Sequence, residues 1–143
     1  MKQTWIVGYD GSDASHRAVA HAAEEAKAHG ARLLLAHVLE WSPYSFLTPE
    51  ELDERHKRRE QELVRGRGVV QPAVDRLTEQ GIDAACVVRY GHAGEILCEI
   101  AAETPAARII IGRTGGSSLT HRLLGSLAIN LAQAAPVPVT IVP

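Results

Sequence analysis

The sequence predicts a single-domain α/β fold in which a doubly wound parallel sheet carries helices on both faces. Five short runs of β-branched and aliphatic residues alternate with helical stretches along the 143 residues. Most of these runs are continuously apolar, which is typical of strands that are covered on both faces. The resulting βαβαβαβαβ order implies parallel strands joined by right-handed crossovers. We expect residues 1–143 to form one domain, because single domains commonly span about 100–200 residues.

The five expected strands include one that differs from the others. Their predicted bounds are Thr4–Tyr9, Arg32–Leu39, Ala84–Tyr90, Arg108–Gly112 and Val137–Val142. The last run alternates with prolines, which cannot donate to a strand ladder and therefore belong at a sheet edge. A hydrophobic edge is open to pairing with another chain, although its prolines would equally suit an edge that stays monomeric. A dimer and a monomer both remain open from this strand alone.

The first expected helix spans Asp13–His29. It places alanines at positions 14, 18, 22 and 26, a smooth stripe that allows close packing on a sheet. Ser12 or Asp13 can cap its start, and Gly30 marks its end. The short side chains therefore predict a helix that lies close to the strands.

The other expected helices have less regular sequences. A long charged stretch covers Pro49–Gln80, but Gly66, Gly68 and Pro72 interrupt it. We therefore expect a kink or two helices there, because proline removes a helical hydrogen bond. A third helix is expected from about Ala93 to Glu103, before the Thr104–Pro105 stop. A fourth should lie within Ser118–Ala135, ahead of Pro136.

Composition excludes several classes of protein. Lys and Arg number 15 against 17 Asp and Glu, a formal charge of −2, so a basic face for nucleic acid is not expected. No signal-peptide pattern opens the chain, and no run of about 18 apolar residues could cross a membrane. The only cysteines, Cys86 and Cys98, stand in apolar stretches. We expect both to be buried, reduced thiols in a cytoplasmic protein.

Two segments that follow strands are rich in glycine and hydroxyl residues. The first is Gly8–Asp13 and the second is Gly112–Ser118, with Gly125–Ser126 later in the chain. Glycines let the backbone approach a ligand and point successive N–H groups at an anion, so these segments suggest a phosphate cradle. Ordinary turns with a helix cap would explain the same residues. The standard P-loop and dinucleotide-binding signatures are absent.

The whole chain resembles the universal stress protein (UspA-like) family. The nucleotide motif of that family is G-x2-G-x9-G-[S/T], and Gly112, Gly115, Gly125 and Ser126 match it without a gap. The opening VGYDGSD is similar to the first strand and turn of the family, and YGHAGEI is similar to the segment before its third helix. The closing PVPVTIVP resembles the dimerising final strand of the family.

The resemblance implies a Rossmann-like five-stranded sheet in the order 3-2-1-4-5 and a site for ATP. It implies that Gly8 and Asp10 lie near the nucleoside and that the Val38 backbone meets adenine. Ile111 and Gly112 would flank the ribose or the phosphates. Backbone N–H groups and one hydroxyl would hold the triphosphate, from Gly115, Gly116, Gly125, Ser126 and Leu127.

The leading functional hypothesis is an ATP-binding, homodimeric stress-response or signalling module that dimerises through residues 137–143. One alternative is a slow ATPase in which Asp10 holds Mg²⁺ with the phosphates, although Asp10 could instead bind a ribose hydroxyl. No second carboxylate is identified for water activation, so no catalytic residue is assigned. The other alternative is an interaction module that binds no nucleotide, which the intact glycine spacing argues against. Neither nucleic acid nor a membrane is expected as a partner.

Overall fold

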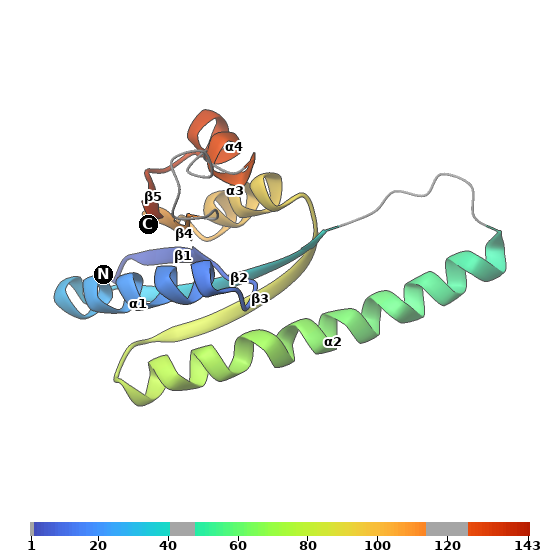
Figure 1. Ribbon diagram of the computed structural model, residues 1–143, viewed down its shortest axis with the longest axis horizontal. Helices are drawn as coiled ribbons and strands as arrows, with labels where there is room; N and C mark the ends of the chain where they lie inside the picture. Colours follow the sequence, from blue (N-terminus) through green and yellow to red (C-terminus); the bar gives the residue numbers. More distant parts are fainter. Residues whose placement is uncertain (1, 41–47, 114–125) are drawn as a thin grey trace.

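The computed structural model describes residues 2–40, 48–113 and 126–143. Five parallel strands form one sheet in the order β3-β2-β1-β4-β5 (Figure 1). In chain order they are β1 (Thr4–Gly8), β2 (Arg32–Glu40), β3 (Ala84–Gly91), β4 (Arg108–Gly112) and β5 (Val139–Val142). The predicted fold class and strand order are confirmed.

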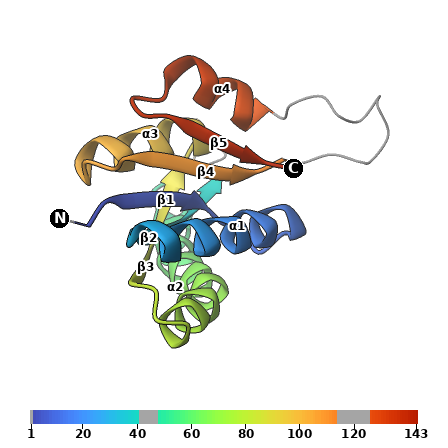
Figure 2. The same ribbon diagram turned by 90° about the vertical axis from the view of Figure 1, so that its left-hand side faces the viewer.

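Helices cover both faces of the sheet, and Figure 2 shows them as two layers with the strands between them. In chain order they are α1 (Asp13–His29), α2 (Pro49–Glu79), α3 (Ala93–Glu103) and α4 (Ser126–Ala134). Successive residues of β1 point to opposite faces, so Trp5 and Val7 pack with α1 and α2 while Ile6 packs with α3 and α4. Each face of the central strand is therefore buried in its own apolar cluster.

Helix α1 follows its predicted bounds closely. The Ser12 hydroxyl accepts a hydrogen bond from the Ser15 backbone N–H at 3.2 Å, and Gly30 ends the helix in the left-handed conformation with φ of 68°. The alanine stripe is buried, with Ala18 and Ala22 both fully covered. Since alanine side chains are short, the axis of α1 lies close to the sheet, and this brings the start of α1 to the carboxyl ends of the strands.

The expectation of two helices is wrong, because α2 runs without interruption from Pro49 to Glu79, with Pro72 inside it. Gly66 lies at a close contact rather than a break: a Cβ there would come within 2.8 Å of Val88 Cγ1. Pro72 lies on the exposed side of the helix, so the Gly68 carbonyl that loses its helical partner faces water. The N-terminal part of α2 extends beyond the sheet (Figure 1), whereas Arg59 and Glu62 still contact Tyr90 on β3.

The remaining elements differ from expectation only at their ends. Helix α3 has its predicted bounds, and α4 lies within the predicted range. Strand β5 begins at Val139, two residues later than predicted. The reason is that Pro138 accepts a hydrogen bond from the Ile109 N–H at 3.0 Å but has no N–H to donate.

The expectation that both cysteines are buried is wrong, because Cys86 and Cys98 are half-buried. Cys86 lies on the edge strand β3, with its Sγ 3.8 Å from the Gln71 side-chain oxygen. Cys98 lies on α3, where partial burial raises the pKa of its thiol. None of the helices in the described ranges is long and apolar enough to cross a membrane.

Candidate functional site

The candidate site lies where the carboxyl ends of β2, β1 and β4 meet. Strand β1 is hydrogen-bonded to β2 on one side and to β4 on the other. The chain leaves β1 toward α1 on one face of the sheet, whereas α4, which follows β4, packs on the other face. This divergence creates the crevice in which doubly wound folds bind ligands.

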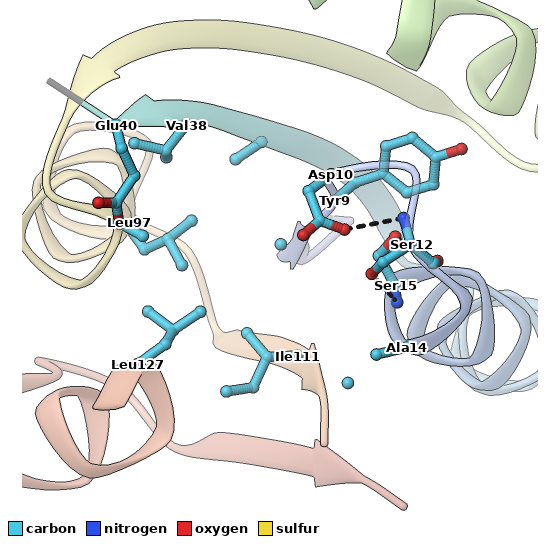
Figure 3. Close-up of a pocket in the computed structure, with 14 residues that line it drawn as sticks. Tyr9, Asp10, Ser12, Ala14, Ser15, Val38, Glu40, Leu97, Ile111 and Leu127 are labelled. Carbon is cyan, nitrogen blue, oxygen red and sulfur yellow. Dashed lines mark hydrogen bonds between the residues drawn. The ribbon is translucent and has the colours of Figure 1, made fainter. Parts of the chain in front are cut away.

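A pocket of about 240 Å³ opens in this crevice (Figure 3). Its walls come from the ends of three strands, the β1–α1 turn, and the facing sides of α3 and α4. The residues that line it are Gly8, Tyr9, Asp10, Ser12, Ala14, Ser15, Ala36, Val38, Glu40, Ala93, Leu97, Ile111, Gly112 and Leu127.

The β1–α1 turn forms one wall and is held by local hydrogen bonds. The Tyr9 N–H donates to the Ala36 carbonyl at 2.9 Å, which continues the pairing of β1 with β2 past the end of β1. Gly11 then adopts φ of 82°, a conformation that side chains disfavour. The Ser12 N–H donates to Asp10 Oδ1 at 2.9 Å, so the turn fixes the carboxylate in the middle of the pocket.

The Asp10 carboxylate is stabilised in its ionised form. Burial by itself raises the pKa of Asp10, but hydrogen bonds from Ser12 and Ser15 and the charge of His37 outweigh that effect. The pKa of this carboxyl is therefore lowered from the ordinary aspartate value of about 4. At neutral pH Asp10 is an anion with acceptor oxygens, suited to a hydroxyl or a cation.

Gly112 brings β4 against the first turn of α1. A Cβ at this position would lie far inside 3.0 Å of the Ala14 carbonyl oxygen and carbon, a separation that real Cβ atoms do not show. Both neighbours are backbone atoms, so no side-chain rotation could relieve the contact. The first glycine of the spaced-glycine motif is thus required by packing, before any ligand is considered.

The exit from β4 is tied to α1 and to β5. Arg17 on α1 donates from Nη2 to the Arg113 carbonyl at 3.0 Å and from Nε to the Pro143 carbonyl at 3.2 Å. The Arg113 N–H in turn donates to the Val142 carbonyl at 2.7 Å. These three hydrogen bonds fix the backbone at the point where the glycine-rich segment begins.

The structure brings six of the ten predicted site residues to this one pocket. They are Gly8, Asp10, Val38, Ile111, Gly112 and Leu127. Ser126 is the exposed first residue of α4 and does not line the pocket, although Leu127 beside it does. Gly115, Gly116 and Gly125 lie outside the described residues. What each of these residues binds stays a prediction.

Several pocket residues were not predicted from the sequence. Ala36 and Glu40 flank Val38 at two-residue spacing on β2, so strand periodicity could have placed them on the same face. Ala93 and Leu97 share one face of α3 at four-residue spacing, but no sequence signal says that this face borders the crevice. Ser12 was expected as a helix cap and as part of the Gly8–Asp13 segment, but was not named as a site residue.

The pocket has chemically different ends (Figure 3). Val38 and Leu97 lie at one end, and Leu127 with Ile111 forms an apolar wall nearby. Ser12, Ser15 and the start of α1 lie at the other end. Asp10 lies between them. The apolar end of such a site can receive a planar apolar group, and Asp10 can accept hydrogen bonds from hydroxyls next to that group. A charged group of the same ligand would then lie near the glycine backbone. In the described part of the chain, no three His, Cys, Asp or Glu side chains gather to hold a metal ion.

Comparisons with known proteins agree on one family. The model of the "Universal stress protein family" matches residues 1–143. A universal stress protein of Thermus aquaticus, encoded in the "QAH/OAS sulfhydrylase 3'region", is 33% identical over 144 residues, which is 99% of each chain.

Solved structures give the same result. A universal stress protein crystallised in complex with cAMP has a TM-score of 0.69 and 31% identity, covering 99% of this chain and 96% of that one. UspA from Lactobacillus plantarum has a TM-score of 0.81 and covers 99% of this chain and 97% of its own. At 21% identity, the second likeness bears on the fold alone.

Proposed function

The chain belongs to the universal stress protein family, and from that premise we propose that it binds an adenine nucleotide, ATP in particular, in the pocket beyond β2, β1 and β4. The observation that carries the proposal is the juxtaposition of an apolar end with the ionised Asp10 in one crevice. A relative with 31% identity over nearly the whole chain was crystallised with cAMP, which supports the same ligand class.

The division of the pocket suggests how the nucleotide lies. The base would occupy the apolar end between Val38 and Leu97, where burial of ring surface contributes to affinity. Asp10 would accept a hydrogen bond from a ribose hydroxyl. The phosphates would then point past Gly112 toward Gly115, Gly116, Gly125 and Ser126, whose N–H groups and hydroxyl suit an anion. Mg²⁺ that accompanies ATP would be bound by the phosphates, with Asp10 as the nearest carboxylate of the pocket.

Titration calorimetry of the purified protein with ATP tests this proposal. We expect saturable binding of one nucleotide per chain, and mass spectrometry of denatured fresh protein should release an adenine nucleotide. Asp10→Asn should weaken binding about ten- to hundredfold, because hydrogen bonds to a charged group are worth about 1.5–3 kcal/mol. Asp53→Asn, on the exposed part of α2, is the matched control and should bind like the wild type. Absence of binding by ATP, AMP and cAMP at millimolar concentration would refute the proposal.

We further propose that residues 1–143 act as one domain of a cytoplasmic homodimer that pairs through β5. This strand is an edge of the sheet, and within the described residues it pairs only with β4. Pro138 and Val142 direct their carbonyls to β4, so Val139 and Ile141 between them direct their backbone groups to the free edge. These backbone groups have no partner among the described residues, and with apolar side chains beside them they favour a second copy. Arg17 contacts both Arg113 and Pro143, so nucleotide bound near Arg113 would be connected to the β5 edge through this side chain.

Light scattering at micromolar concentration checks the assembly. We expect twice the chain mass of 15.4 kDa for the wild type. Val139→Pro removes one outward N–H but none of the hydrogen bonds to β4, so this variant should be monomeric with its sheet intact by circular dichroism. A wild-type mass of 15.4 kDa would contradict the dimer.

A further inference from the structure

We propose that Glu40 selects the base of the bound nucleotide, by accepting a hydrogen bond from the exocyclic amine of adenine. This inference rests on the proposed function, because it assigns a partner to one edge of the same ligand. It concerns a side chain that lines the pocket and that neither the glycine motif nor the phosphate cradle involves.

The position of Glu40 follows from strand geometry. It is the last residue of β2 and stands two residues after Val38, so both side chains leave the same face of the strand. Figure 3 shows the Glu40 carboxylate directed toward Leu97, at the end of the pocket opposite Ser12 and Ser15. Its backbone is held by the pairing of Glu40 with Gly91 on β3. The carboxylate therefore stands at the rim of the apolar end.

The two carboxylates of the pocket have different surroundings. Asp10 is fixed by the Ser12 N–H within its own turn and lies in the middle of the pocket. Glu40 lies beyond Val38, at the far end of the pocket, and is also exposed. A negative charge there disfavours phosphate by Coulomb repulsion. It favours a neutral group that donates hydrogen bonds, and the amine of a base in the apolar end is such a group.

The chemistry predicts an order of preference among purines. Adenine presents an amine that can donate to the carboxylate. Purine itself carries only C–H at that position. Hypoxanthine presents a carbonyl oxygen, whose lone pairs repel a carboxylate. Glu40 would therefore favour ATP over both purine riboside triphosphate and ITP, through the amine that only adenine carries at this ring position.

Calorimetric titration of these three nucleotides into wild-type protein and two variants tests the assignment. For the wild type we expect ATP to bind about tenfold more tightly than purine riboside triphosphate, the value of one hydrogen bond to a partly exposed charged group. Glu40→Ala should bind all three nucleotides with nearly equal affinity. Its affinity for purine riboside triphosphate should equal that of the wild type. Glu40→Gln should regain affinity for ITP, because its amide can donate to the carbonyl oxygen.

Three outcomes would overturn the inference and separate it from the proposed function. Equal wild-type affinity for the three nucleotides would reject base selection while leaving nucleotide binding intact. Unchanged discrimination in Glu40→Ala would assign the selection to other groups, such as the Val38 backbone. An equal loss for all three nucleotides in that variant would indicate a structural role. Glu24→Ala, on the exposed side of α1, is the matched control and should behave as the wild type. Failure of the wild type to bind any of the three would instead reject the proposed function.

Discussion

Replacing Gly112 by alanine is expected to lower the free energy of unfolding by about 3 kcal/mol or more, measured by urea denaturation without nucleotide. The added methyl group would overlap the carbonyl of Ala14, which lies in the first turn of α1. Relief requires that β4 and α1 move apart, and both contribute to the apolar cluster around Trp5 and Val7. Ordinary overpacking of side chains costs about 1–3 kcal/mol of stability. An overlap with backbone atoms should cost as much as the upper end of that range or more.

Gly68→Ala is the matched control for this change. Gly68 lies on the exposed side of α2, and a Cβ there would meet nothing within 4 Å. Alanine is the better helix former by about 1 kcal/mol, so this variant should be as stable as the wild type or more stable. Similar stability of the Gly112 and Gly68 variants would show that β4 and α1 are not packed as the structure has them. Because nucleotide is absent from the measurement, the result does not depend on the proposed function.

Local sequence patterns were sufficient to predict most helices and strands of the fold, whereas the strand order was implied by the family resemblance. Ser12 and Gly30 have opposite preferences at helix ends, so the bounds of α1 followed from the chain itself. The interruption expected in α2 was wrong for a tertiary reason. Gly66 allows contact with Val88 on β3, and Pro72 lies toward water, and neither fact is visible in a local pattern. Packing determined whether these residues broke the helix.

The site was less predictable than the fold. Asp10 and Gly112 follow two strands that are neighbours in the strand order implied by the resemblance, so their approach to one crevice could be predicted. Glu40 was missed because the predicted strand stopped at Leu39, which left the direction of the next side chain undefined. Leu97 was missed because the face that α3 turns to the pocket depends on how the helix packs. A boundary error of one residue on β2 thus concealed the carboxylate to which we assign base selection.

Val38→Phe is expected to reduce the affinity for ATP by more than about a hundredfold while the protein stays folded. Val38 is partly buried on β2, and its side chain contributes to the apolar end of the pocket. A benzyl group there would occupy space that a purine ring requires within a pocket of about 240 Å³. Since the larger side chain fills existing space, we expect the free energy of unfolding to change by less than about 1.5 kcal/mol.

Calorimetry of Val38→Phe, with urea denaturation of the same sample, separates a blocked pocket from a damaged fold. Val64→Phe makes the same change on α2, where Val64 is 71% exposed, and should bind ATP like the wild type. Affinity that survives in Val38→Phe would mean that the base lies outside the apolar end. In that case the pocket would hold the nucleotide by its sugar and phosphates alone. The weaker ATP binding expected for Asp10→Asn would still follow, but Glu40 would have no base to select. A loss in Val38→Phe but not in Val64→Phe therefore supports the placement of the base, on which the role assigned to Glu40 depends.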